Sequence, residues 1–303
     1  MIGIQKRWVS ILLLHWCASW LPTGDAVASA PASVPKKCAD DAKFNDPAPA
    51  MHIYGNTWYV GSCALSAILI TSKSGNVLID GDTEQAPRMI EARIKELGFR
   101  IRDVHLIAIS HAHLDHVGGI EKLRQDSAAG VLARGADADA LLRGKGDRSD
   151  PQFLRISGFP AVANVRKISD GDSFTVGTIV ITAHATAGHT PGSTSWTWES
   201  CEQSRCLHMV YADSLYAVSD DVYKFGDEHQ HPGVVARFRA SIATVGALPC
   251  DILLTPHPEA SDMWQRLGAN PSQPLIDPSA CKRYAENAAR GLEERLMREQ
   301  SSP

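Results

Sequence analysis

The sequence HAHLDH at residues 111–116 concentrates side chains that can bind metal ions. Alternate residues of an extended strand end point to the same side, so His111 and His113 can face one common point. A turn that follows can carry Asp115 and His116 toward a second point. Neutral imidazoles and a carboxylate are ligands that zinc accepts. A histidine-rich surface loop is the alternative, but three histidines and an aspartate within six residues favour a segment that serves two metal ions.

Two further histidines stand in turns that suit metal binding. His189 lies in the sequence GHTPG at 188–192, where glycines leave the backbone free to approach a metal closely. His257 lies in TPHP at 255–258, where prolines with a fixed φ stiffen the end of an apolar run. Together with the 111–116 segment they complete two ligand sets.

Strand and helix patterns alternate along the chain and place these ligands at strand ends. We expect strands at 58–60, 66–71, 76–79, 104–109, 131–133, 173–176, 178–183, 193–198, 208–212 and 251–254. We expect helices at 87–97, 119–123, 136–142, 234–245 and 282–299, and a long loop at 143–160. Sheets with outer helices and a site along their common edge fit this pattern.

The first thirty residues have the pattern of an export signal. Lys6 and Arg7 precede an apolar core at 8–21, and residues 28–30 (ASA) form a small-residue cleavage site. We therefore expect a signal peptide at 1–30 and a single domain at 31–303. The apolar core is shorter than the ~20 residues of a membrane span, and no later stretch approaches that length. These features favour soluble secretion to the periplasm without a stable membrane anchor.

Removing this signal leaves an even number of cysteines, namely Cys38, Cys63, Cys201, Cys206, Cys250 and Cys281. An even number in an exported protein favours disulfide bonds over free thiols. Spacing alone does not choose among the possible pairings, although Cys201 and Cys206 flank a short polar stretch typical of a hairpin loop. No CxxC pair occurs, which argues against a cysteine metal site.

The charge balance excludes one class of partner. Thirty basic residues stand against thirty-four acidic ones, a net charge of −4. This balance lacks the basic stripe that nucleic-acid binding usually needs. We therefore expect a small-molecule partner and no nucleic acid.

In its motifs the chain resembles the metallo-beta-lactamase superfamily. The motifs are LIDG at 78–81, HxHxDH at 111–116, GHTPG at 188–192, ADS at 212–214, and His257. More narrowly it resembles subclass B3, through GHTPGSTSWTW at 188–198, YADSL at 211–215 and PCDILLTPHPE at 249–259. The resemblance implies an α/β fold, the four-layer αβ/βα sandwich, in which helices flank two β-sheets.

The resemblance also implies two Zn²⁺ ions and divides the ligands between them. The first zinc would be held by His111, His113 and His189, and the second by Asp115, His116 and His257. Two adjacent ions lower the pKa of a bridging water toward neutrality. The implied reaction is attack by this hydroxide, oriented by Asp115, on a β-lactam carbonyl, without a serine nucleophile or an acyl-enzyme.

Supporting roles are assigned more loosely. Asp80 is expected to hold a zinc-binding imidazole or neighbouring backbone by hydrogen bonds. Related hydrolases use an aspartate at the place of Asp213 to bridge two metals. Another lactamase subclass uses a cysteine ligand here, and in the B3 pattern Ser214 occupies the place of that cysteine without binding metal. Asp213 is then structural or supports a ligand; a bridging Asp213 is the alternative.

Candidate substrate contacts follow from the same comparison and from the long loop. Ser214 is implied to help hold the substrate carboxylate, but Tyr216 replaces the small hydroxyl residue that B3 relatives carry two positions later. Gln152, in the long loop, is a second candidate contact, with simple solvation as the alternative.

The resemblance thus implies a dizinc β-lactamase, active on penicillins, cephalosporins and carbapenems, and we expect a monomer. Another hydrolase on the same scaffold, a lactonase or a glyoxalase II-like thioesterase, is the alternative. Export argues against the thioesterase, whose glutathione conjugates are cytosolic. A non-catalytic zinc-binding protein would require an incomplete ligand set, and none of the six positions is missing.

Overall fold

The structure is a computed structural model that describes residues 33–36, 38, 41–220 and 222–301. These residues belong to one compact unit that spans residues 31–303. The export signal expected at 1–30 lies outside the described residues. Within them, no helix has the length and apolar character that crossing a bilayer requires.

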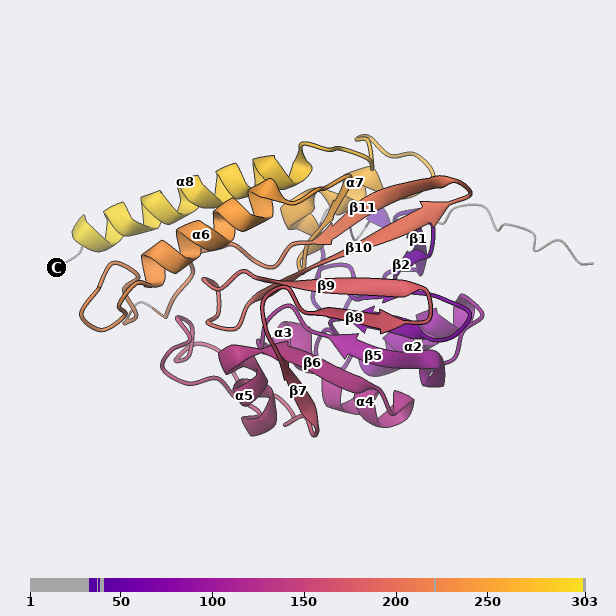
Figure 1. The fold of residues 1–303 in the computed structure, drawn as a ribbon, viewed down its shortest axis with the longest axis horizontal. Coiled ribbons are helices and arrows are strands. Elements are labelled where there is room, and N and C mark those ends of the chain that lie inside the picture. Colours follow the sequence, from indigo (N-terminus) through magenta and orange to yellow (C-terminus); the bar gives the residue numbers. More distant parts are fainter. Residues whose placement is uncertain (1–32, 37, 39–40, 221, 302–303) are drawn as a thin grey trace, which may run out of the picture. The chain divides into compact units, whose positions relative to one another are not determined.

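The first sheet has seven strands in the order β1-β2-β3-β4-β5-β6-β7 (Figure 1). The strands are β1 (Met51–Tyr54), β2 (Thr57–Tyr59), β3 (Ile68–Ile70), β4 (Asn76–Ile79), β5 (Val104–Ala108), β6 (Gly130–Arg134) and β7 (Val165–Ile168). Strands β1 to β4 form an antiparallel meander, whereas β4 to β7 pair in parallel. Parallel strands end at one common edge, so the residues after β5 lie at that edge.

The second sheet has five strands in the order β12-β11-β10-β9-β8. The strands are β8 (Ser173–Val176), β9 (Ile179–Ala185), β10 (Thr194–Glu202), β11 (Arg205–Tyr211) and β12 (Ile252–Leu254). Neighbours pair antiparallel except β11 and β12, which run parallel.

Helices cover the outer face of each sheet (Figure 1). The first sheet carries α2 (Pro87–Glu96), α4 (Ile120–Ser127) and α5 (Gly135–Arg143), and the second carries α6 (Val234–Ala247) and α8 (Ala280–Ser301), which lie side by side. Shorter turns are η1 (Ile101–Asp103), α3 (Leu114–Val117), η2 (Pro258–Ser261) and α7 (Met263–Arg266).

Successive residues of the central strands point into different cores, and this explains why helices cover both sheets. In β4, Val77 and Ile79 belong to the core between the two sheets, whereas Leu78 belongs to the core under the helices. In β11, Met209 enters the core between the sheets and Val210 packs toward α6 and α8. Successive strand residues point to opposite faces, so strands that are apolar at every position need cover on both sides. The predicted four-layer αβ/βα sandwich is confirmed.

Most elements lie where the sequence places them, with two exceptions in the first sheet. The sequence analysis did not predict β1 or β7, which occupy the two edges of that sheet. Strand β7 contains the exposed residues Arg166 and Lys167, so it lacks the apolar run that marks a central strand. The long loop expected at 143–160 begins one residue later, because Arg143 is the last residue of α5, and residues 144–160 contain no helix or strand.

The cysteines form three disulfide bonds, Cys38–Cys63, Cys201–Cys206 and Cys250–Cys281. Cys201 and Cys206 face each other across the β10–β11 hairpin, as their flanking sequence indicated. The other two bonds join segments that spacing alone could not pair. One ties the N-terminal segment to the loop after β2, and the other ties α8 to the segment before β12.

Candidate metal centre

Ends of strands from both sheets supply the candidate ligands. His111 and His113 follow β5, and the extended His113 (φ −105°, ψ 150°) directly precedes α3. This single helical turn redirects the chain, so Asp115 and His116 leave from a different direction. From the second sheet, His189 lies in the turn between β9 and β10, and His257 follows β12.

The side chains gather into two groups of three. His111, His113 and His189 form the first group, and Asp115, His116 and His257 form the second; within each group one possible ligand atom per residue lies within 4.8 Å of the others. The groups adjoin, because the ring centroids of His111 and His116 are 4.4 Å apart. The structure therefore brings together all six predicted ligands, divided as the resemblance implies.

Hydrogen bonds orient the imidazoles of the first group. His111 Nδ1 donates to Asp213 Oδ1 at 2.7 Å, and His113 Nε2 donates to Asp150 Oδ2 at 3.0 Å. Each bond fixes the tautomer and leaves the other ring nitrogen available to a metal. His111 Nε2 is buried without a hydrogen-bond partner among the described residues. An unpaired buried nitrogen of this kind fits a metal ligand.

The third imidazole follows the same rule. His189 Nδ1 donates to the backbone oxygen of Tyr216 at 3.0 Å, which leaves Nε2 as an acceptor. The amide nitrogen of Gln152 lies 3.2 Å from this Nε2 and donates to it. A metal ion on Nε2 would take the place of this bond and release the Gln152 amide.

Burial keeps His111 and His189 uncharged. It lowers the pKa of His111 well below the usual value, with a further lowering from the neighbouring histidines. Burial also lowers the pKa of His189 to about 4, and the electrostatic interaction with His113 acts in the same direction. Metals bind the neutral imidazole, so both rings are ready for a metal at neutral pH.

The second group contains a charged pair. Burial raises the pKa of Asp115, but the charge and hydrogen bond of His116 outweigh this effect and hold it well below the usual value. Burial likewise acts to lower the pKa of His116, and the Asp115 carboxylate raises it to about 9. His116 Nε2 lies 3.3 Å from both Asp115 Oδ2 and His257 Nε2. These atoms lie close enough together to bind one metal ion.

Comparison with known proteins agrees with this geometry. Residues 60–202 match the family model of the metallo-beta-lactamase superfamily. The solved structure of MEM-A1, a subclass B3 metallo-beta-lactamase from a soil metagenome library, is 39% identical, with a TM-score of 0.82 over 86% of this chain and 99% of that chain. The chain belongs to the metallo-beta-lactamase superfamily.

Other solved metallo-beta-lactamases are equally similar. Rm3 metallo-beta-lactamase is 44% identical, with a TM-score of 0.82 over 88% of this chain and 99% of that chain. MIM-1 from Novosphingobium pentaromativorans is 40% identical, with a TM-score of 0.84 over 89% of this chain and 99% of that chain. The chain is thus a hydrolase of the metallo-beta-lactamase superfamily.

A curated relative matches over a shorter length. The human mitochondrial persulfide dioxygenase ETHE1 is 35% identical over 133 residues, which are 43% of this chain and 42% of that protein. The chain therefore spans less than half the length of this relative.

Asp80 supports the metallo-beta-lactamase site through the backbone. Its carboxylate accepts hydrogen bonds from the N–H and hydroxyl of Ser110 at 2.7 and 2.6 Å, and from the Tyr211 hydroxyl at 2.8 Å. It lies 3.9 Å from His116 Nδ1, beyond hydrogen-bond distance. Of the two roles expected from the sequence, the structure places Asp80 in the one that holds the backbone beside His111.

Sequence reasoning missed two carboxylates of the site. Asp150 holds His113, as described above, and Asp137 on α5 joins two ligand-bearing segments. Asp137 Oδ2 accepts from the Ala112 N–H at 3.0 Å and the Thr190 hydroxyl at 2.7 Å, while Oδ1 accepts from the Gly192 N–H at 2.9 Å. Neither aspartate belongs to a ligand motif. The position of Asp150 directly before Pro151, inside the long loop, was the one available signal.

The metal groups open into a cleft of about 550 Å³. Both predicted substrate contacts line it: Ser214, a buried residue after β11, and Gln152 from the long loop. Tyr216 and Phe44 also line the cleft and are about half exposed. The Phe44 ring lies 6.0 Å from the His257 ring, so the N-terminal segment borders the second metal group.

Proposed function

We propose that this chain is a periplasmic dizinc β-lactamase that hydrolyses the amide bond of penicillins, cephalosporins and carbapenems. The convergence of six ligands in two groups of three on one cleft carries the proposal. The chain is similar to a subclass B3 metallo-beta-lactamase over nearly the whole length of that protein, and this similarity supports β-lactams as the substrate class.

The donor set fits zinc. Five imidazoles and one carboxylate are nitrogen and oxygen ligands of the kind that zinc prefers, and three protein ligands per ion leave coordination positions open. When bound, zinc ions lower the pKa of water toward neutrality and polarise a carbonyl group.

Asp115 is the residue suited to orient the attacking water. Its carboxylate stays ionised at neutral pH, and its side chain is 22% exposed toward the cleft. An ionised carboxylate accepts hydrogen bonds only, so Asp115 can align a water molecule with the carbonyl carbon. We assign no residue as a covalent nucleophile.

Ser214 and Gln152 are suited to bind polar groups of the substrate. The Ser214 hydroxyl can donate to the carboxylate that β-lactams carry, and the Gln152 amide can donate to a carbonyl or carboxylate oxygen. Tyr216 and Phe44 supply apolar surface for substrate side chains. The bulky Tyr216 at a position of small hydroxyl residues gives this pocket its own shape.

Hydrolysis by the purified, zinc-loaded protein tests the proposal. The substrates are a carbapenem, a penicillin, an acyl-homoserine lactone and a glutathione thioester, each with and without chelator. We expect chelator-sensitive hydrolysis of both β-lactams. Preferential hydrolysis of the lactone or the thioester would instead support the alternative hydrolases.

His189→Ala is the matching variant, with His208→Ala as its control. His208 is exposed on β11 and lies outside both metal groups. We expect His189→Ala to lose first-site zinc and abolish hydrolysis, while His208→Ala keeps both. Unchanged metal stoichiometry in His189→Ala would contradict its role as a ligand.

Location and assembly need their own measurements. Fractionation of cells that express the full chain should place the activity in the periplasm, with a chain shortened by about the first thirty residues. Gel filtration with light scattering should give the mass of a monomer. Activity confined to the cytoplasm would exclude the proposed export.

A further inference from the structure

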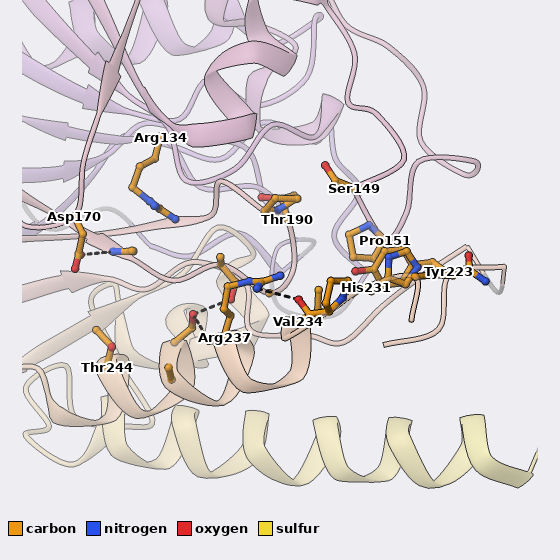
Figure 2. Close-up of a pocket in the computed structure, with 18 residues that line it drawn as sticks. Arg134, Ser149, Pro151, Asp170, Thr190, Tyr223, His231, Val234, Arg237 and Thr244 are labelled. Carbon is orange, nitrogen blue, oxygen red and sulfur yellow. Dashed lines mark hydrogen bonds between the residues drawn. The ribbon is translucent and has the colours of Figure 1, made fainter. Parts of the chain in front are cut away.

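A second cleft, of about 590 Å³, shares a wall with the metal cleft. Figure 2 shows the residues that line this second cleft. Gly188, Thr190 and Pro191 line the second cleft, whereas His189, between them, lines the metal cleft. Helix α6 forms the opposite wall. The function proposed above uses none of the side chains of this second cleft.

Arg134, at the end of β6, points into this cleft with unused hydrogen-bonding capacity (Figure 2). Its guanidinium donates one long bond, from Nη2 to Ser193 O at 3.4 Å, and its Nε atom is buried without a partner among the described residues. A guanidinium carries five N–H donors and stays charged at physiological pH. Leaving buried donors unpaired is unfavourable, so this group would gain from an anionic partner.

A second arginine enters the cleft from α6 (Figure 2). Arg237 is exposed, and Nη1 donates to the backbone oxygen of Pro232 at 3.1 Å. In the described part of the chain, no carboxylate forms an ion pair with Arg134 or Arg237. Asp170 is the acidic residue that lines the cleft, and its Oδ1 accepts the Ala185 N–H at 2.7 Å. The lining therefore carries two arginines and one aspartate, and the carboxylates of Asp137 and Asp213 also act on Arg134 electrostatically.

An aromatic pair lies in the same cleft. The rings of Tyr223 and His231 stack with centroids 3.7 Å apart and an interplanar angle of 18°. Tyr223 is 1% exposed, so the half-buried His231 offers the accessible ring. Burial lowers the pKa of His231, which favours the uncharged imidazole. The remaining wall is largely small and apolar, as at Ala187 and Ala240. Such a surface suits a flat apolar body.

We propose that this cleft binds a small aromatic carboxylate, with its carboxylate between Arg134 and Arg237 and its ring against His231, which stacks on the buried Tyr223. Arginine is suited to this contact because its planar fork matches a carboxylate. Binding here needs no metal ion and no β-lactam hydrolysis, so it stands apart from the proposed function.

The test titrates the zinc-loaded full chain with 4-phenylbutyrate, and in parallel with the uncharged 4-phenylbutyramide. Affinity is measured by calorimetry, and amide NMR shifts of Gly188, Thr190 and Val234 report whether this cleft is occupied. We expect saturable binding of the carboxylate with shifts at these residues, and at least about tenfold weaker binding of the amide.

Variants on α6 and β6 localise the site. Ala240→Trp fills the cleft, and Ala236→Trp, an exposed position of the same helix outside the cleft, is its control. Arg134→Gln and Arg237→Gln each remove one of the two positive charges that line the cleft. Arg239→Gln is the control, because the native Arg239 side chain pairs with Glu293. We expect the cleft variants to weaken binding at least about tenfold and the controls to leave it unchanged.

Three results would overturn the proposal. They are no saturable binding to the native chain, equal binding of the carboxylate and the amide, and binding that survives Ala240→Trp and Arg237→Gln. Since Ala240 and Arg237 are exposed, these two variants should fold even if Arg134→Gln does not. The binding measurement does not depend on β-lactam hydrolysis, so a variant that loses this activity still tests the proposal.

Discussion

His111 Nδ1 lies 2.7 Å from Asp213 Oδ1, and the two side chains are 1% and 0% exposed. This bond turns His111 Nε2 toward the first metal group. The second Asp213 oxygen, Oδ2, is buried and has no hydrogen-bond partner in the described part of the chain. Burial raises the pKa of Asp213, while the charge of His189 acts to lower it. The contact suits an aspartate that supports His111, and it leaves open the bridging alternative through Oδ2.

Asp213→Asn should separate these two roles. The variant keeps the shape of the side chain but weakens the acceptor for His111 Nδ1. If Asp213 acts through His111, zinc affinity of the first site should fall about 10–100-fold while two zinc ions still bind at saturation. Competition with a chromophoric chelator measures both quantities. Loss of one zinc at saturation would favour the bridging role.

Local sequence predicts the ligands well because HAHLDH, GHTPG and TPHP each combine a ligand with the turn that positions it. The layers follow from apolar strands such as β4. The sequence did not predict the roles of Asp137 and Asp150. Both lie far along the chain from the ligand segments that they contact, and no local sequence pattern marks such contacts. The disulfide partners of Cys38 and Cys250 could not be predicted for the same reason.

Asp137→Asn should destabilise the protein and weaken the metal centre. Burial raises the pKa of Asp137 to about 6, yet its two oxygens accept three hydrogen bonds from the segments that carry His111, His113 and His189. An asparagine has one acceptor oxygen, so at least one buried donor loses its partner, at a cost of about 1–3 kcal/mol. Denaturant unfolding of the zinc-loaded protein measures the loss.

Asp139→Asn is the control for this substitution. Asp139 lies on the same helix, and its partly exposed side chain pairs with Lys167. Exposed ion pairs contribute little, so the control should lose less than about 1 kcal/mol. Equal losses in the two variants would contradict the linking role of Asp137.

Zinc binding to the second group should release about one proton at pH 7. His116, with a pKa of about 9, is protonated at this pH, whereas His257, with a pKa lowered to about 4 mainly by burial, is neutral. Asp115 is already ionised. Coordination through His116 Nε2 must therefore displace its proton. Release should fall as pH rises through about 9, where the free imidazole is already neutral.

Calorimetry in buffers of different ionisation enthalpy measures this release. The His189→Ala variant isolates the second group, because its first group is incomplete. A heat of binding that is independent of the buffer at pH 7 would mean that His116 is neutral before zinc arrives, and the Asp115–His116 charge pair would then be wrong.

The disulfide bonds should contribute unequally to stability. Cys250–Cys281 closes a loop with a sequence separation of 31, whereas Cys201–Cys206 spans 5 residues within a hairpin. Cross-links that close longer loops remove more entropy from the unfolded chain, and this model gives a difference of about 1–2 kcal/mol. Replacing both cysteines of each pair by serine and measuring denaturant unfolding tests the order. Equal losses, or a larger loss for the hairpin pair, would show that strain or residual structure outweighs loop entropy here.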